Sequence, residues 1–308
     1  MSSAEDVRER LKAYYGTDVP LSLARLLTAV LADEIVEQAF QESTVFYFTG
    51  TLDRSVIDCA APLPPRPTLR YHNEPPELLR FAATGMDGEQ MGLLQLAEEL
   101  PFDELPVVGY FPMEFGRETF ALGDDLESGI RAAMSIYDRQ GEEITPLSLP
   151  EVFPTPLRPA ASPAWAPHTP PARKGYRFEM TSDRVGVFAP EEAFGAVHRP
   201  FGGWPYRMPR AGQLEDLLAR AEGFLTEGFP ASAIAVAREL RVEASQVNRE
   251  IFGRSVQIWR DAAMQLGRTW LAAMVDEIVA PDLTVRSGTA YGTISFSIAE
   301  SATTDDDE

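Results

Sequence analysis

A short turn at residues 86–89 carries the pair of carboxylates that comes closest to a catalytic motif. Asp87 and Glu89 flank Gly88, and two carboxylates at this spacing can bind a divalent cation or act as acid and base. The regular spacing of a calcium loop is absent, and Asp and Gly are also the residues that a tight turn requires. We interpret the segment as a turn, with a metal-dependent hydrolase as the alternative.

Four more carboxylates gather in one predicted loop, at Glu98, Glu99, Asp103 and Glu104. A run of charges is commonly a solvated face. Complementary charge also speeds encounter with a basic partner and selects for it. The sequence therefore predicts a surface for a basic protein, and its partner-binding residues are these four together with Asp87 and Glu89.

The remaining reactive side chains are scattered. His72, His168 and His198 lie far apart, and none falls in a metalloprotease-type spacing. The chain has no nucleophile elbow, phosphate loop or dinucleotide fingerprint. Cys59, the one cysteine, follows an apolar pair and is typical of a small buried residue. We predict no catalytic residue, no metal site and no cofactor, and a protein that is not an enzyme.

Charge and composition narrow the class of partner. The formal charge is −20, and the first 150 residues hold 26 acidic against 11 basic residues. Such a charge repels nucleic acid and attracts basic ligands. A single cysteine excludes an intrachain disulfide and fits a reducing cytoplasm. The sequence contains no run of about 18 apolar residues, so we predict no membrane span. We expect a cytoplasmic protein that binds neither membrane nor nucleic acid; the oligomeric state stays open.

One segment of the second half, in contrast, has a pattern that is typical of DNA binding. Residues 236–251, VARELRVEASQVNREI, have the profile of a helix-turn-helix. In that arrangement Gln246, Asn248 and Arg249 would face the major groove of DNA. Because Arg241 stands where such a turn normally has Gly, and the flanks are not strongly basic, a plain helical hairpin is favoured. A DNA-binding transcription regulator is the alternative function.

The elements that must position these residues follow from periodicity and capping signals. In the first half we predict helices at 3–15, 20–40, 75–81 and 124–137, and strands at 44–49, 90–96 and 105–111. The second helix has an apolar stripe at three- and four-residue steps, made of Leu23, Leu26, Leu27, Val30, Leu31, Ile35 and Val36.

The second half begins after a segment rich in proline. Nine prolines between 146 and 171 favour an extended, semi-rigid tether. Beyond it we predict a hairpin at 176–188, helices at 214–226, 231–240, 245–252 and 255–279, and closing strands at 283–286 and 293–298. The last helix keeps one apolar stripe throughout, made of Trp259, Ala263, Leu266, Trp270, Met274 and Ile278.

Two phrases of the first half resemble the SUKH superfamily, the Smi/Knr-type fold of cell-wall regulators and toxin-immunity proteins. Residues 11–27, LKAYYGTDVPLSLARLL, are similar to its opening pair of helices. Residues 76–94, PELLRFAATGMDGEQMGLL, are similar to its short helix followed by an acidic Gly turn and a strand, and residues 107–113, VVGYFPM, to the next strand. The resemblance covers about residues 5–140 and implies a protein-binding scaffold, often an immunity protein.

Together these features predict an α+β fold, with a SUKH-like mixed helix and sheet domain followed by a mainly helical second domain. The predicted boundaries are 1–145 for the first domain, 146–174 for a Pro-rich linker, 175–300 for the helical domain with short strands, and 301–308 for a disordered acidic tail. The expected function is a non-catalytic protein-binding module, a toxin-immunity or regulatory protein that occludes a basic partner sterically and electrostatically.

Overall fold

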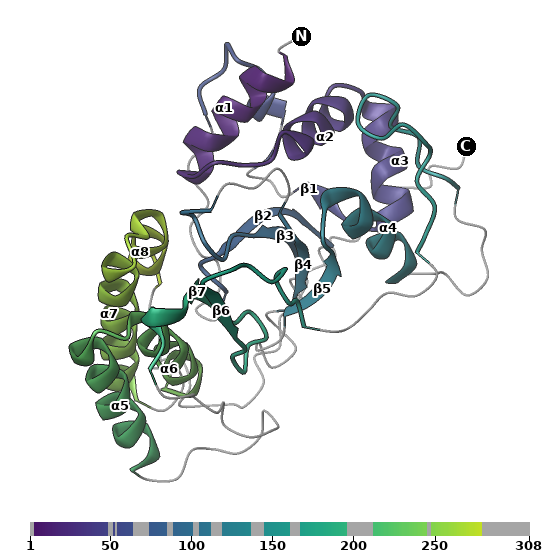
Figure 1. The fold of residues 1–308 in the computed structure, drawn as a ribbon. Coiled ribbons are helices and arrows are strands. Elements are labelled where there is room, and N and C mark those ends of the chain that lie inside the picture. Colours follow the sequence, from purple (N-terminus) through teal and green to yellow (C-terminus); the bar gives the residue numbers. More distant parts are fainter. Residues whose placement is uncertain are drawn as a thin grey trace, which may run out of the picture.

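The computed structural model describes residues 3–48, 52, 54–63, 74–84, 89–100, 105–111, 119–136, 145–160, 167–195, 212–244 and 248–278. Over these residues the chain has an α+β fold, as predicted: N-terminal helices and a five-stranded antiparallel sheet precede a C-terminal helical region. Figure 1 shows the N-terminal helices on one side of the sheet and helices α5–α8 on the other. No helix among the described residues is long and apolar enough to cross a bilayer.

The N-terminal layer consists of α1 (Ala4–Tyr15), α2 (Leu21–Leu31) and α3 (Glu34–Thr44). Ser3 caps α1 in a capping box with Asp6, and Gly16 ends it in the left-handed region at φ 75°. The predicted helix 3–15 is therefore confirmed. Its buried side chains are Val7, Leu11, Tyr14 and Tyr15.

The predicted single helix at 20–40 is wrong, because the chain breaks at Asp33. The Asp33 side chain accepts a hydrogen bond from the Ile35 backbone N–H at 2.8 Å and starts α3 as its N-cap. The new helix has a different phase, so Ile35 leaves the apolar stripe and is 78% exposed. Leu23, Leu26, Leu27, Val30 and Leu31 keep their predicted places in the core.

The sheet has its five strands in chain order, each antiparallel to its neighbour. They are β1 (Tyr47–Phe48), β2 (Leu78–Ala83), β3 (Gln90–Leu94), β4 (Val107–Tyr110) and β5 (Thr119–Gly123), with the 3₁₀ turn η1 (Arg54–Val56) after β1 and helix α4 (Leu126–Ile136) after β5. The strands predicted at 90–96 and 105–111 and the helix at 124–137 are confirmed. The strand predicted at 44–49 is reduced to β1, since α3 runs through Thr44.

The helix predicted at 75–81 is wrong, and its residues form β2. All six residues of this strand are buried, because helices or a hairpin cover both faces of the sheet. An apolar run without alternation fits a buried strand and a helix equally well, and the preceding prolines favoured the helix. The element that the SUKH resemblance implied at this position is therefore a strand, and β5 was not predicted at all.

The two faces of the sheet have different partners. One face presents Leu79, Phe81, Met91, Leu93, Val107 and Phe120 to a continuous apolar core shared with α1–α4. On the other face Leu78, Leu94, Val108 and Tyr110 pack with Val185 and Phe188 of a hairpin. Strand alternation places Arg80 and Gln90 on this second face. The second face thus mixes apolar and charged side chains.

The first part of the segment predicted as a tether, residues 145–160, packs against the protein. Leu147 and Leu157 pair as an isolated antiparallel bridge and are buried. The Ala160 backbone donates to the Arg131 carbonyl of α4 at 2.9 Å and accepts from the Ser135 hydroxyl at 2.8 Å. These contacts fasten residues 145–160 to the first half, so this part does not act as a spacer. The domain boundaries themselves stay a prediction.

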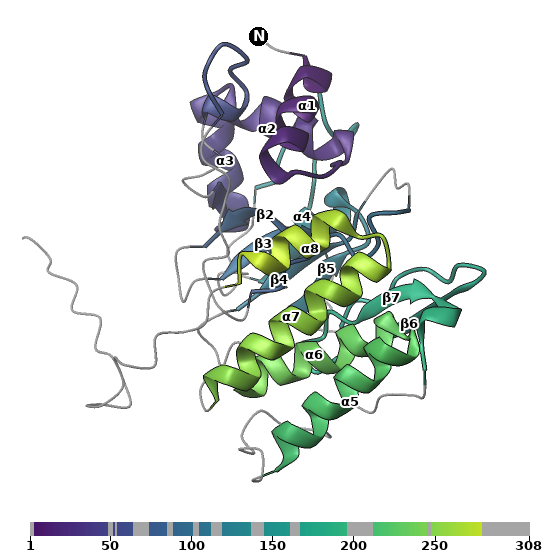
Figure 2. The same ribbon diagram turned by 90° about the vertical axis from the view of Figure 1, so that its left-hand side faces the viewer.

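In its described residues the second half has a hairpin and four helices. The hairpin pairs β6 (Tyr176–Glu179) with β7 (Val187–Pro190) and is followed by the 3₁₀ turn η2 (Glu191–Ala193), which confirms the predicted hairpin. The helices are α5 (Gln213–Glu227), α6 (Pro230–Ala244), α7 (Arg249–Gln265) and α8 (Thr269–Asp276). In the view of Figure 2, α7 and α8 pass in front of the sheet. The predicted helix 255–279 is divided at Gly267, and the predicted strands after 279 lie outside the described residues.

Candidate functional site

Two of the predicted partner-binding carboxylates bind the chain's own C-terminal region. Glu98 and Glu99 lie between β3 and β4, and Glu98 accepts from the Trp270 backbone N–H at 3.1 Å. Glu99 forms an ion pair with Arg268, through contacts of 2.7 and 3.0 Å. Arg268 itself is 2% exposed. We call Glu98, Glu99 and Arg268 the acidic clamp.

The acidic clamp fixes the start of α8 from several sides. The Arg268 guanidinium also donates to the Phe188 carbonyl of β7 at 2.6 Å, and the Trp270 indole donates to the Tyr15 carbonyl of α1 at 2.8 Å. Burial raises the pKa of the Glu98 carboxyl, although the backbone N–H groups of Trp270 and Leu271 oppose this. The clamp therefore joins three segments that are far apart in sequence.

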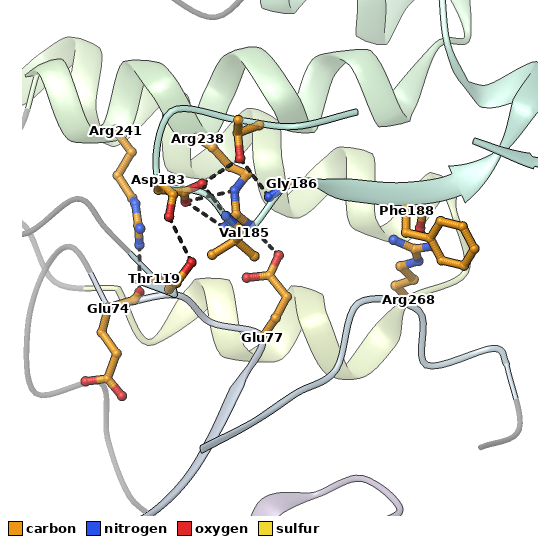
Figure 3. A network of polar contacts seen from close by, with 11 residues as sticks. Glu74, Glu77, Thr119, Asp183, Val185, Gly186, Phe188, Arg238, Arg241 and Arg268 are labelled. Carbon is orange, nitrogen blue, oxygen red and sulfur yellow. Dashed lines mark hydrogen bonds and ion pairs between the residues drawn. The ribbon is translucent and has the colours of Figure 1, made fainter. Parts of the chain in front are cut away.

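A second polar cluster lies between the sheet and α6, and Figure 3 shows it together with Arg268. Arg238 of α6 donates to Asp183 at 2.6 and 3.1 Å, and its other guanidinium nitrogen bonds Glu77 at the start of β2. All three side chains are buried. We call the set of Glu77, Asp183, Arg238 and Arg241 the ionic layer.

Arg241, one turn along α6, completes the ionic layer. It donates to the Glu74 carbonyl at 3.0 Å. Both arginines lie over the Trp259 ring of α7, with guanidinium carbons 4.7 and 5.1 Å from its centroid. Burial, reinforced by the positive charge of Arg238, lowers the pKa of Arg241 to about 10. The two arginines of α6 therefore contact the sheet region through Glu77 and Glu74 and contact α7 through the Trp259 ring.

The two carboxylates of the ionic layer differ in their proton affinity. Burial raises the pKa of Glu77, against the opposing positive charge of Arg238. For Asp183 burial acts in the same direction, but Arg238 and the hydrogen bond from Thr181 outweigh it and lower the pKa. Removing one member of such a set leaves buried charge without compensation. The layer is thus built to hold the two halves together.

A third buried group lies on the second face of the sheet. Arg80 contacts Glu74 at 3.4 Å and Gln90 at 3.3 Å, and Tyr15 donates its hydroxyl to the Arg80 carbonyl at 2.7 Å. Glu89, one of the predicted site residues, is buried, and its carbonyl accepts from the Thr84 backbone N–H at 3.1 Å. Its backbone therefore joins the end of β2 to the start of β3.

The remaining predicted site residues are placed only in part. Asp87, Asp103 and Glu104 lie outside the described residues, as do His72 and His198. His168 is buried, and burial lowers its pKa. Cys59, predicted as buried, is exposed beyond η1. In the part of the chain that the structure describes, no cluster of three His, Cys, Asp or Glu side chains could hold a metal ion.

The turn predicted for the helix-turn-helix is wrong. Helix α6 continues through Leu240, Arg241 and Val242 to Ala244, so the predicted turn lies inside a helix. Asn248 caps α7, its side chain accepting from the Ile251 backbone at 3.1 Å. Gln246 lies outside the described residues, and Arg249 is exposed in the first turn of α7.

Four of the five arginines in residues 236–260 are engaged within the protein. Arg238 and Arg241 are buried in the ionic layer, Arg254 pairs with Glu222, and Arg260 pairs with Asp276. Phosphate contacts need accessible arginines. DNA binding stays an untested prediction, but this geometry does not favour it.

The comparisons with known proteins add no identification. No protein-family model matches the chain, and a search of curated proteins finds no significant match.

Sequence reasoning missed the ionic layer. Its members stand 55 and 161 positions apart along the chain, so no local pattern pairs them. One signal was present: Arg238 and Arg241 interrupt the apolar run of α6, where nearly every residue is buried. An arginine in such a run is expected to have a buried acidic partner.

Proposed function

We propose that this protein is a non-catalytic protein-binding module whose N-terminal helical layer docks a basic partner. The observation that carries the proposal is the charge of that layer. Residues 3–48 hold eight acidic and four basic residues. Carboxylates of α1 and α3 are strongly exposed, with Glu5 at 66% and Glu34 at 81%.

The basic residues of the layer cancel only part of this charge. Arg8 pairs with Glu5 at 3.9 Å and Lys12 with Asp18 at 2.7 Å, and Arg54 of η1 pairs with Glu34 at 2.9 Å. The Arg10 guanidinium donates to the carbonyls of Ser55, Val56 and Ala61, at 2.8 to 3.0 Å. Arg8 donates to the Val19 carbonyl at 2.9 Å. These backbone contacts occupy part of both guanidinium groups, whereas Glu9 and Glu42 are exposed. Such a surface accelerates encounter with a basic protein.

The acidic clamp also favours docking at the N-terminal helical layer. Glu98 and Glu99 already have partners in α8, so in this state the docking charge comes from α1 and α3. The SUKH resemblance of residues 5–140 supports an immunity or regulatory role, in which the module covers a basic active site. A cytoplasmic location belongs to the proposal, since the chain has one cysteine and no disulfide to maintain.

Affinity capture with a charge-reversed control tests the proposal. The bait is the full chain, and the test variant carries Glu9→Lys, Glu34→Lys and Glu42→Lys. A control variant makes the same charge change on the second half, with Glu192→Lys, Glu227→Lys and Glu250→Lys at exposed positions. Native lysate is passed over each bait at low and raised salt.

We expect a basic protein to be captured by the wild type and the control but lost with the test variant. Raised salt should weaken capture, because exposed charges are screened. Equal capture by both variants, or no capture by the wild type, would contradict the proposal.

A further inference from the structure

The bend between α7 and α8 depends on one glycine. Gly267 has φ +74°, and the Arg268 backbone N–H donates to the Ala263 carbonyl at 2.9 Å while that of Gly267 donates to Met264 at 3.0 Å. This pair of hydrogen bonds is a Schellman motif, which ends a helix with a left-handed residue. An added Cβ at Gly267 would meet no atom within 4 Å. The backbone angle alone therefore favours glycine here.

The sequence on both sides of the bend also fits an unbent helix. The stripe of Trp259, Ala263, Leu266, Trp270 and Met274 continues at three- and four-residue steps across Gly267. The bent form is therefore one of two helical arrangements that this pattern supports. In the unbent form α8 would extend α7 and leave the sheet.

The acidic clamp supplies the N-terminal cap that α8 lacks on its own. This helix has eight residues and no side-chain cap, since Arg268 occupies its N-cap position. Helices of this length are unstable in isolation. Glu98 caps it from another part of the chain, and Glu99 pairs with the arginine just before it. The carboxylates thus bind an arginine together with the helix N-terminus that follows.

We propose that Glu98 and Glu99 form a binding site for an arginine that immediately precedes a helix, filled here by Arg268 and α8, and taken by a basic partner when the bend at Gly267 opens. The inference rests on the proposed function, because it names a second place where the same basic partner binds. It also makes the partner's access depend on the chain's own conformation. The intramolecular α8 competes at high effective concentration, so the closed form excludes the partner.

Substitution of the hinge glycine tests the opening in the full chain. Gly267→Ala disfavours the left-handed angle and favours a continuous helix, which should shift the equilibrium toward the open form about tenfold. The control is Gly253→Ala, at an exposed position in α7 that also has open space around it. Hydrogen exchange of the amides of residues 269–276 measures the opening. We expect faster exchange in Gly267→Ala and no increase in Gly253→Ala.

A peptide with the sequence of residues 266–278 then tests the site itself. Fluorescence anisotropy should show that it binds the Gly267→Ala chain about tenfold more tightly than the wild-type chain, which the hinge shift predicts. Arg268→Gln in the peptide should weaken this binding by up to about fivefold, because it removes the pair with Glu99 without changing the chain's own α8. Unchanged exchange in Gly267→Ala, an undetectable interaction with the peptide, or equal binding of the Arg268→Gln peptide would each overturn the inference.

This experiment is separate from the capture experiment. The peptide is a defined probe, so its binding does not depend on α1, α3 or any partner in a lysate. Peptide binding without capture would support the Glu98 and Glu99 site but refute the proposed function. Capture without peptide binding would support the proposed function but refute the site.

Discussion

The two faces of the sheet are held by different forces. On the face toward α1–α4, side chains such as Phe81, Leu93 and Val107 belong to a continuous apolar core. On the face toward α6 the ionic layer joins the sheet to the helices through Glu77, Asp183 and Arg238. Apolar packing tolerates small shifts, whereas a buried ion set needs every member. The helical region is therefore attached to the sheet by buried ions in addition to apolar contacts.

The largest effect should come from removing the cation at the centre of the ionic layer. Arg238→Ala leaves Glu77 and Asp183 buried without their cation and removes a contact with Trp259, so we expect a loss of about 3–5 kcal/mol. Urea unfolding of the full chain measures it. Arg25→Ala, at an exposed position of α2, should change stability by less than about 0.5 kcal/mol. A loss for Arg238→Ala as small as that of the control would mean that the layer does not hold the two halves.

The second largest loss of stability is expected from a substitution on the apolar face of the sheet. Gly109 of β4 lies opposite Phe120 of β5, and an added Cβ would collide with the Phe120 ring. Gly109→Ala should therefore destabilise by about 1–3 kcal/mol through displaced packing. Gly223→Ala in α5, where a Cβ meets nothing within 4 Å, should instead stabilise by about 0.5–1 kcal/mol. Denaturant unfolding distinguishes them, and a stabilising Gly109→Ala would contradict the packing.

Local features of this fold were predictable from the sequence, and its long-range pairings were not. Ser3 and Gly16 mark the ends of α1 because capping depends on neighbouring residues. Asp33 carried the same kind of signal, a capping residue followed by Glu34, and the apolar stripe around it hid the break.

Strand β2 and the ionic layer needed tertiary information. The run at residues 78–83 has no alternation because both faces of the sheet are covered, so periodicity did not separate strand from helix. Arg238 meets Asp183 and Glu77 only after the chain has folded. Glu98 and Glu99 were predicted to bind a partner, and in the structure they bind the Trp270 backbone and Arg268 at the start of α8. Binding of an external partner there stays a prediction.

The pH dependence sharpens the difference within the ionic layer. The pKa of Glu77 is raised in the folded state, so the cost of its buried charge disappears as pH falls through that raised value toward 4.5. Wild type should therefore gain stability relative to Glu77→Gln over that window. Asp183 has a lowered pKa, so its contribution is present above 3.8 and is lost as pH falls below it.

Urea unfolding of wild type and Glu77→Gln at a series of pH values measures this difference. The comparison between the two chains cancels the titration of the other carboxylates. A wild type that loses stability relative to Glu77→Gln as pH falls toward 4.5 would contradict the assignment.

The smallest effect is expected at the acidic clamp. Glu99 is 30% exposed, so water screens its pair with Arg268, and Glu99→Gln should cost about 1 kcal/mol or less. A double-mutant cycle with Arg268→Gln, followed by urea unfolding, isolates the pair. Additive losses would show that the two side chains do not interact. This pair is one of the contacts that α8 must give up to open, together with the packing of its buried side chains Trp270, Leu271, Ala272, Met274 and Val275.

Native-state hydrogen exchange on the full chain tests this difference between the regions most directly. Amides of α8 should exchange through a local opening, faster than those of β3 and β4, and Arg268→Gln should accelerate α8 alone. If α8 and the sheet instead exchange together at one rate, and Arg268→Gln accelerates both equally, the helix is an inseparable part of the core and the account is contradicted.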